Sequence, residues 1–460
     1  MSKNSDSGQS APLNRYQHWV ITCLVIGICL PLLDATIIGV AIPSLTVSLS
    51  ASVAQLQWVS TLYTLSATVT VTICAWATRR VGAKNLWLTG LVVFTLGSLL
   101  CGFSSHIDFL LASRVIQGIG AGILMPVMQT VLVNAVGKQN LKGAMATIAV
   151  PTVIAPIAGP IVAGYLLHIG DWRLIFFINV PIGIAAIVLS AMCITRNDKA
   201  ESIRFDLMGF LLLTPSLLFM IYSLSLLTKA DTMSPLHWLI MVGILLASLI
   251  LILLFVRHTR NKTSDALIQL TPFKVSSFTA SIWLLLLSSI SFYGGLFALP
   301  IMFIHGFQQS ELLASIWIGA HGVGALLSRS YLKSLSERFS VSNLALIGTI
   351  MTIFGTVPLF LHNIPSHPEI IMVTMLLRGA GIGLLTLLAM SHAYNELPAT
   401  QVPDASVITR IGTLFGASLG TATVAVLYSI SPSRENFSLI LLGLLFITFC
   451  CTIPALKLRR

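Results

Sequence analysis

The chain is a succession of long apolar runs separated by short polar connectors such as "VGKQNLKG" and "RHTRNKTSD". Each run has about 20 residues, the length that an α-helix needs to cross the hydrocarbon layer of a bilayer. A membrane-spanning β-barrel would instead show short segments of alternating polarity. The pattern therefore predicts an all-α polytopic membrane protein with fourteen transmembrane helices, at about 19–41, 54–76, 87–104, 109–132, 144–166, 174–194, 207–227, 237–256, 279–304, 312–330, 342–362, 369–391, 405–429 and 437–456.

Composition excludes a soluble protein. The 460 residues are 56% hydrophobic and only 9% charged, with a mean hydropathy of +0.92. Soluble domains carry about 25% charged residues. The seven cysteines lie in or at the ends of the apolar runs, without the spacing of metal ligands. We therefore expect small buried thiols and no metal site.

The distribution of basic residues predicts the topology. Of the 26 Lys and Arg residues, 21 fall on the side of the N-terminus, three fall on the opposite side, and two lie inside spans. Because basic loops stay in the cytoplasm, we expect both termini there and an even number of spans. The net charge of +11 is then a topology signal, and we expect no binding of nucleic acid.

The chain also contains a weak internal repeat. "TRRVGAKNLWLTG" (78–90) aligns with "SERFSVSNLALIG" (336–348) at a constant offset of 258 residues, and "RVIQGIGAGIL" (114–124) resembles "RGAGIGLL" (378–385). Two related halves of this kind are typical of transporters that bind their substrate near the midplane. The expected organisation is a cytoplasmic tail (1–18), an N-terminal six-helix bundle (19–200), two additional transmembrane helices (201–262), a C-terminal six-helix bundle (263–456) and a second cytoplasmic tail (457–460).

Two charged residues lie deep in the predicted spans of the first half. Asp34, in "LLDATIIGVAIP", is the only acid well inside a span, and Arg114 lies in the fourth span. At 1.5 Å per residue both lie ~10 Å below the outer edge, so they could pair or communicate through water. Such residues are functional candidates by default. We expect Asp34 to bind and release a proton with Arg114 as its electrostatic partner, and the alternative is a static structural pair.

Small residues and prolines cluster beside this pair. Gly118 and Gly120 follow Arg114 in the fourth span, and small residues permit close approach of helices in lipid. The fifth span contains "APIAGPIVAG", whose prolines remove backbone donors and whose glycines allow bending. Its candidate residues are Pro156, Gly159, Pro160 and Gly164. The alternative is ordinary packing glycines and kinks.

Other polar and adaptable residues are weaker candidates. His321 lies near the middle of its span and could titrate, and Arg378 has no acid at comparable depth in its own half. We expect Arg378 to meet backbone carbonyls or an anionic group of a substrate. Gln117, Met125 and Tyr63 are candidates for a substrate cavity, and the alternative for all of these side chains is packing.

The chain has no motif typical of an enzyme. "GIGAG" imitates a nucleotide-binding loop, but it follows no predicted strand and lies inside a span. H-E-x-x-H does not occur, and the G-x-S-x-G match "GASLG" (416–420) lies inside a predicted span. We therefore expect no enzymatic activity, and transport driven by ATP would need a partner chain.

These motifs together resemble the major facilitator superfamily, and within it the 14-helix drug:proton antiporters of the EmrB/QacA type, over about residues 17–456. "LLDATIIGVAIP" resembles the first-helix signature, "RVIQGIGAG" the fourth-helix signature and "APIAGPIVAG" the antiporter motif of the fifth helix. The resemblance implies a multi-pass protein of the bacterial inner membrane that exports small amphipathic compounds in exchange for protons. It implies no cofactor beyond the coupling proton. A monomer is expected, and a periplasmic adaptor and an outer-membrane channel are conceivable partners.

The loop between the second and third spans departs from the family. There the family usually has Gly-x-Leu-Ala-Asp-Arg-x-Gly, and this chain has "AWATRRVG", with Arg79 in the place of the acid and with Arg80 and Gly82 kept. Glu337, beside Arg338, stands in the matching acidic position of the second copy, so we expect the charge of this gate to have moved between halves. Two alternatives stay open: a dedicated metabolite or siderophore exporter of the same fold, and a passive facilitator or membrane sensor.

Overall fold

The computed structural model describes residues 13–51, 53–169, 171–195, 203–226, 234–260, 262, 265–361, 367–430 and 434–458. Within these ranges the chain forms helices joined by turns and contains no strand. The α-helices are α1 (Arg15–Ser48), α2 (Val53–Val81), α3 (Ala83–Gly102), α4 (Ile107–Ile169), α5 (Leu174–Phe177), α6 (Asn179–Cys193), α7 (Leu207–Leu226), α8 (Pro235–Arg260), α9 (Ser276–Ile301), α10 (Glu311–Arg338), α11 (Val341–Phe354), α12 (Pro368–His392), α13 (Val402–Ile430), α14 (Arg434–Cys450) and α15 (Thr452–Lys457).

Local sequence signals explain several of the helix boundaries. Asn14 accepts a hydrogen bond from the backbone of Gln17, whose side chain accepts one in return, so α1 begins with a capping box. The side chains of Ser310 and Ser340 cap α10 and α11 by accepting a hydrogen bond from the backbone N–H of Leu313 and of Asn343. Gly137, at φ 69°, interrupts the long α4 at the connector expected between the fourth and fifth spans.

Each predicted span falls on a helical segment, and the expected all-α membrane fold is confirmed. Among the described residues, twelve helices are long and apolar enough to cross a membrane. The two other predicted spans are 144–166, in the second part of α4, and 312–330, in α10, whose shorter apolar stretch is Ile316–Ser328. The number of fourteen spans therefore stays a prediction that is compatible with the structure.

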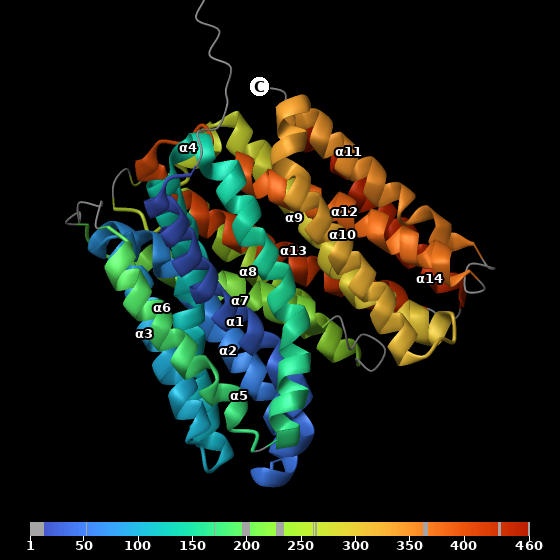
Figure 1. Ribbon diagram of the computed structural model, residues 1–460, viewed down its shortest axis with the longest axis horizontal. Helices are drawn as coiled ribbons and strands as arrows, with labels where there is room; N and C mark the ends of the chain where they lie inside the picture. Colours follow the sequence, from blue (N-terminus) through green and yellow to red (C-terminus); the bar gives the residue numbers. More distant parts are fainter. Residues whose placement is uncertain are drawn as a thin grey trace, which may run out of the picture.

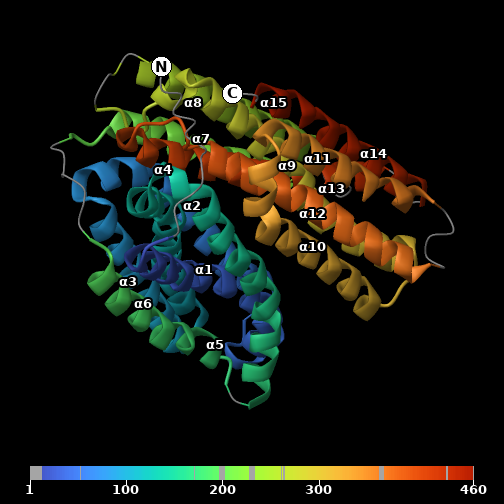
Figure 2. The same cartoon turned by 45° about the horizontal axis from the view of Figure 1, so that its top comes forward.

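The helices form two groups that lean against each other. Helices α1–α6 make up one group and α9–α15 the other, and Figures 1 and 2 show the groups converging at the end where both termini lie and diverging toward the opposite end. We call these the terminal end and the far end. Between the groups, α2 contacts α13, and α4 contacts α10, α12 and α13.

The α7–α8 pair packs beside the junction of the two groups. Helix α7 contacts α2 and α13, and Met220 and Leu224 pack there on Ala422 of α13. Helix α8 contacts α7 and leaves most of its apolar surface exposed, including Leu239 and Leu253. An apolar helix with an exposed surface fits contact with lipid.

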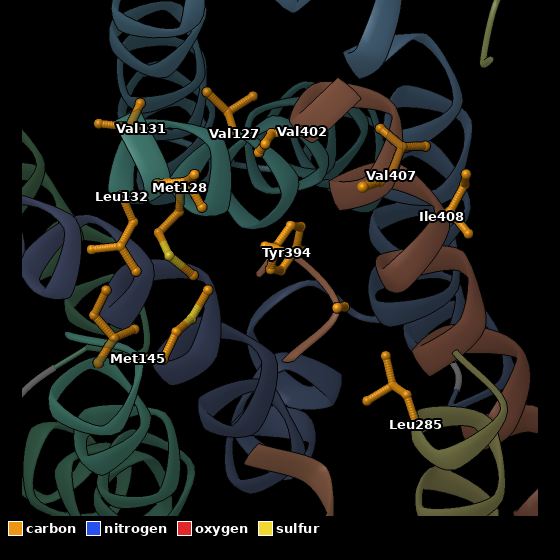
Figure 3. Close-up of a cluster of buried hydrophobic side chains, with 14 of the residues drawn as sticks. Val127, Met128, Val131, Leu132, Met145, Leu285, Tyr394, Val402, Val407 and Ile408 are labelled. Atoms are coloured by element: carbon orange, nitrogen blue, oxygen red, sulfur yellow. The ribbon is translucent and has the colours of Figure 1, made fainter. Parts of the chain in front are cut away.

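At the terminal end, buried side chains join the two groups. Figure 3 shows Val127, Met128 and Val131 of α4 close to Val402 of α13 and to Tyr394, which follows α12. Polar contacts accompany this apolar cluster: the Tyr394 hydroxyl donates to Gln129 Oε1, and Thr130 Oγ1 lies 3.4 Å from Ser406 Oγ. The terminal end is therefore closed by direct contact between the groups.

Candidate functional site

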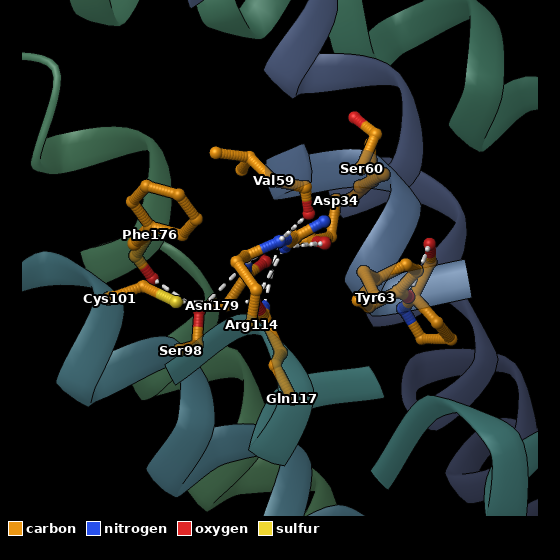
Figure 4. A network of polar contacts seen from close by, with 12 residues as sticks. Asp34, Val59, Ser60, Tyr63, Ser98, Cys101, Arg114, Gln117, Phe176 and Asn179 are labelled. Carbon is orange, nitrogen blue, oxygen red and sulfur yellow. Dashed lines mark hydrogen bonds and ion pairs between the residues drawn. The ribbon is translucent and has the colours of Figure 1, made fainter. Parts of the chain in front are cut away.

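A buried polar network links three helices of the first group. Asp34 comes from α1, Arg114 and Gln117 from α4, and Asn179 from the start of α6, and Figure 4 shows these side chains converging. Asp34 is 2% exposed and Arg114 is 1% exposed. Arg114 lies on the same face as Gln117 because residues three apart on a helix are neighbours.

Hydrogen bonds close a ring around the carboxylate. Arg114 Nη1 donates to Asp34 Oδ2 at 2.6 Å and to Gln117 Oε1 at 2.6 Å, and Gln117 Nε2 donates to Asp34 Oδ1 at 2.8 Å. Asn179 Nδ2 lies 3.4 Å from Asp34 Oδ1, and Arg114 Nε donates to the carbonyl of Val59 at 3.1 Å. A buried ion pair holds together only when its remaining donors and acceptors are satisfied in this way.

Tyr63 separates this network from a cavity. The guanidinium carbon of Arg114 lies 4.2 Å from the centre of the Tyr63 ring, within the range of cation–π attraction. Tyr63 also lines a cavity of about 190 Å³. A molecule in this cavity would therefore contact the aromatic ring on which Arg114 rests.

The cavity lies between α1, α2 and α4 of the first group and α13 of the second. Two of the predicted cavity residues, Met125 and Tyr63, line it, whereas Gln117, His321 and Arg378 do not. The described residues that line it are Pro31, Leu32, Ala35, Tyr63, Thr64, Ala67, Thr68, Val71, Ala121, Gly122, Met125, Arg410 and Leu414. Arg410 is the one charged residue among these.

The glycines of α4 permit close helix packing around the network. A Cβ atom on Gly118 would strike the carbonyl oxygen of Tyr63, and one on Gly120 would strike the backbone of Phe94. In the second part of α4, a Cβ on Gly159 would meet Thr36 Oγ1 on α1. Gly164 has no such neighbour within 4 Å, and the side chains of Pro156 and Pro160 lie outside the described residues.

In the second group, Arg378 and His321 occupy positions related to the network. Gly355 faces the backbone of Arg378 just as Gly97 faces that of Gln117, and Gly379 approaches the carbonyl of His321 as Gly118 approaches that of Tyr63. The position that corresponds to Arg378 is therefore Gln117 and not Arg114.

Arg378 is held differently from Arg114, because no carboxylate of the described residues forms an ion pair with it. Arg378 Nη2 donates to the carbonyl of Ser291 at 3.0 Å, while Nε and Nη1 have no hydrogen-bond partner in the described part of the chain. A Cβ on Gly295 would strike this guanidinium, so a glycine on α9 leaves the space that it fills. The His321 ring stacks on Phe292, with 5.9 Å between ring centres.

An ion pair that the sequence did not predict bridges the two groups at the terminal end. Arg79 Nη1 donates to Asp404 Oδ2 at 2.9 Å, and Arg79 Nη2 donates to the carbonyl of Ala266 at 2.8 Å. The backbone N–H of Gln269 donates to Asp404 Oδ1 at 2.7 Å. We call Arg79, Asp404 and the segment 266–269 the terminal clasp.

Three other residues predicted for this gate lie at helix ends. Gly82, at φ 86°, takes a conformation that favours glycine and separates α2 from α3. Arg80 and Arg338 are exposed at the ends of α2 and α10, and the side chain of Glu337 lies outside the described residues. The acid that faces Arg79 is thus Asp404, at the start of α13.

A second acid fastens the same connecting segment outside the membrane spans. Asp206 accepts hydrogen bonds from Lys262 Nζ at 2.8 Å and from the backbone N–H of Leu267 at 3.2 Å, and its Oδ1 lies 2.9 Å from His258 Nε2. Burial raises the pKa of Asp206, but the bonds from Lys262, His258 and the backbone outweigh it and hold the pKa at about 2. The segment that leads from α8 to α9 is thus tied to both α7 and the clasp.

Sequence reasoning missed Asn179, Arg410 and Asp404. An asparagine at a helix start is typical of a cap, so Asn179 gave no separate signal. Arg410 counts among the basic residues on the side of the N-terminus, whereas it lies two turns inside α13. The acid of Asp404 was likewise assigned to a span end, although the unmatched Arg79 was a signal that an acid should face it.

Known proteins resemble this chain in sequence. A sequence model of the Major Facilitator Superfamily matches residues 24–421. The Multidrug resistance protein B homolog of Mycobacterium tuberculosis (strain ATCC 25618 / H37Rv) is 30% identical over 397 residues, which cover 86% of this chain and 73% of that protein. The Putative multidrug resistance protein MdtD of Citrobacter koseri is 32% identical over 265 residues, or 58% of this chain and 54% of that protein.

Solved structures share the arrangement of helices. The human organic anion transporter MFSD10 (TETRAN) superimposes with a TM-score of 0.63 at 13% identity, over 95% of this chain and 99% of that chain. A bacterial homologue of the iron transporter ferroportin, in an outward-facing state, superimposes with a TM-score of 0.62 at 12% identity, over 97% and 99%. At these identities the likeness is one of fold.

Proposed function

The chain belongs to the major facilitator superfamily and is a multi-pass membrane transporter, and from this premise we propose that it exports small amphipathic compounds in exchange for protons. Relatives named for multidrug resistance, at about 30% identity, support export of organic compounds. In this proposal the protein resides in a bacterial inner membrane with both termini in the cytoplasm. It works as a monomer, and the proton is the coupling ion.

The observation that carries the proposal is the buried ring of Asp34, Arg114 and Gln117 behind Tyr63. While Asp34 is ionised, it neutralises Arg114 and holds α1 against α4. When Asp34 takes up a proton, the ion pair is lost and the guanidinium is left with neutral partners only. Proton uptake therefore changes the contacts between α1, α4 and the cavity wall, which is what coupling requires.

In the proposed cycle the present conformation faces outward. The terminal end, on the cytoplasmic side in this topology, is closed by the apolar cluster around Tyr394 and by the clasp of Arg79 and Asp404. The two groups diverge toward the far end (Figure 2), from which a proton would reach Asp34. Opening to the cytoplasm would require separation of the clasp, followed by release of the proton and binding of substrate.

Transport in inverted membrane vesicles tests the proposal. The probes are a panel of fluorescent amphipathic dyes of both charges, and respiration supplies the proton gradient. We expect the wild-type protein to accumulate at least one dye and Asp34→Asn to abolish accumulation. An unchanged rate in Asp34→Asn would refute the assigned coupling, and accumulation by no dye would point to the dedicated exporter, facilitator or sensor.

A further inference from the structure

The central cavity carries an unbalanced positive charge. Arg410 projects from α13 into a cavity whose other described lining residues are neutral and mostly apolar, with no acid among them. In the described part of the chain, Arg410 makes no hydrogen bond or ion pair with another residue. The ionisable groups that interact electrostatically with Arg410 are the phenols of Tyr293 and Tyr63. Its charge is therefore available to a molecule in the cavity.

Neither neighbouring acid can serve as its partner. Asp34 lies behind Tyr63 and already accepts hydrogen bonds from Arg114, Gln117 and Asn179. Asp404 lies six residues earlier on α13, where Arg79 and the backbone of Gln269 bind both of its oxygens. Both of these carboxylates are thus engaged, and the described residues offer Arg410 no counterion.

The chemistry of an arginine in an apolar cavity selects the occupant. A guanidinium presents a fork of donors that matches a carboxylate, sulfonate or phosphate group, and it is costly to bury without an acceptor. A cation would meet repulsion there. The apolar walls from α1, α2 and α4 would receive a hydrophobic body, as in most small-molecule sites.

We infer that the cavity binds an amphipathic organic anion, with its acidic group on Arg410 and its apolar body against Met125 and Tyr63. This inference names the substrate class of the proposed exporter and rests on that proposal only for the direction of transport. The Arg114 guanidinium packs on the same Tyr63 ring. The bound anion is therefore one side chain, that of Tyr63, away from the ion pair of Asp34 and Arg114.

Equilibrium binding without any proton gradient tests the inference. The probes are 1-naphthoate and 1-naphthamide, which share an apolar body and differ in charge at pH 7. Binding to the purified full chain in detergent is measured by calorimetry, with empty micelles as the blank. We expect the wild-type protein to bind the naphthoate about tenfold more tightly than the amide, since a hydrogen bond to a charged group is the stronger one.

Matched variants separate charge from structure. Arg410→Met should weaken naphthoate binding about tenfold and leave naphthamide binding unchanged, which also shows that the variant is folded. Arg410→Lys should bind the naphthoate with an affinity between that of the wild-type protein and that of Arg410→Met. Arg260 is exposed at the end of α8, and Arg260→Met should leave the affinity for both probes unchanged.

Three results would overturn the inference: equal wild-type affinity for the two probes, equal loss of both in Arg410→Met, or binding of neither probe by the wild-type protein. All three leave the proton coupling at Asp34 untouched. Failure of Asp34→Asn to affect dye transport would in turn leave this binding result standing, so the two proposals fail separately.

Discussion

At the residue scale, the polar network shows which side chains a sequence can identify. Asp34 and Arg114 are conspicuous because a charge inside an apolar run is costly. In the structure Arg114 Nη1 lies 2.6 Å from Asp34 Oδ2. Asn179 is neutral and gave no comparable signal. The hydrogen-bond ring with Gln117 depends on helices far apart in sequence, so spacing alone could predict the pair but not its surroundings.

Two glycines of one sequence motif in α4 differ in how closely they pack against another helix. Gly159 and Gly164 belong to the same ten-residue stretch, but only Gly159 lies against another helix, where a Cβ would meet Thr36 Oγ1. We predict that Gly159→Ala lowers the melting temperature and transport, because α1 must move away from α4 close to Asp34. Overpacking of this kind typically costs about 1–3 kcal/mol.

Gly164→Ala is the matched control. Its methyl group would meet nothing within 4 Å, and alanine is the better helix former by about 1 kcal/mol. We expect unchanged or slightly higher stability, measured by thermal unfolding in detergent. Equal destabilisation by both substitutions would contradict the close approach of α4 to α1.

At the element scale, the helices could be predicted and their pairing across the molecule could not. Runs of about 20 apolar residues determine helices because the bilayer leaves backbone groups no other partner. The polar connector near Gly137 marks the break in α4. In contrast, the partner of Arg79 is Asp404, on the opposite half of the chain, and no local pattern relates the two.

The terminal clasp makes a prediction about how α2 and α13 are held together. Loss of the Asp404 charge leaves Arg79 buried without a carboxylate, which should weaken closure of the terminal end. Closure can be measured in a chain without its native cysteines that carries Thr130→Cys and Ser406→Cys. The hydroxyl oxygens of Thr130 and Ser406 lie 3.4 Å apart, so the two new thiols are close together when the end is closed. We expect oxidative cross-linking to be several-fold slower when Asp404→Asn is added.

The control for the clasp is a charge change outside it. Asp171→Asn alters an exposed pair with Arg173, on the loop between α4 and α5, and should leave the cross-linking rate unchanged. If Asp404→Asn cross-links as fast as the parent chain, the apolar cluster around Tyr394 alone keeps the terminal end closed.

At the scale of the whole molecule, the internal repeat predicts two related halves, and the helices lie in the two groups α1–α6 and α9–α15 (Figure 2). What the repeat could not predict is the asymmetry between them. The first half holds a complete ion pair, while the second places Arg378 beside Gly295 without a carboxylate and sends Arg410 into the cavity. Of the three arginines Arg114, Arg378 and Arg410, only Arg114 is paired with a carboxylate among the described residues.

This asymmetry gives a prediction about the energetics of a full cycle. A proton moving inward and a monovalent anion moving outward both carry positive charge inward, so the membrane potential should drive both steps, at roughly 2.3 kcal/mol per charge for 100 mV. In inverted vesicles that accumulate 1-naphthoate, clamping the potential to zero with valinomycin and potassium should slow uptake strongly at constant pH gradient. Vesicles with Asp34→Asn report the passive distribution of the anion. Uptake that ignores the potential would exclude exchange of an anion for a proton and would favour an occupant with a compensating positive charge.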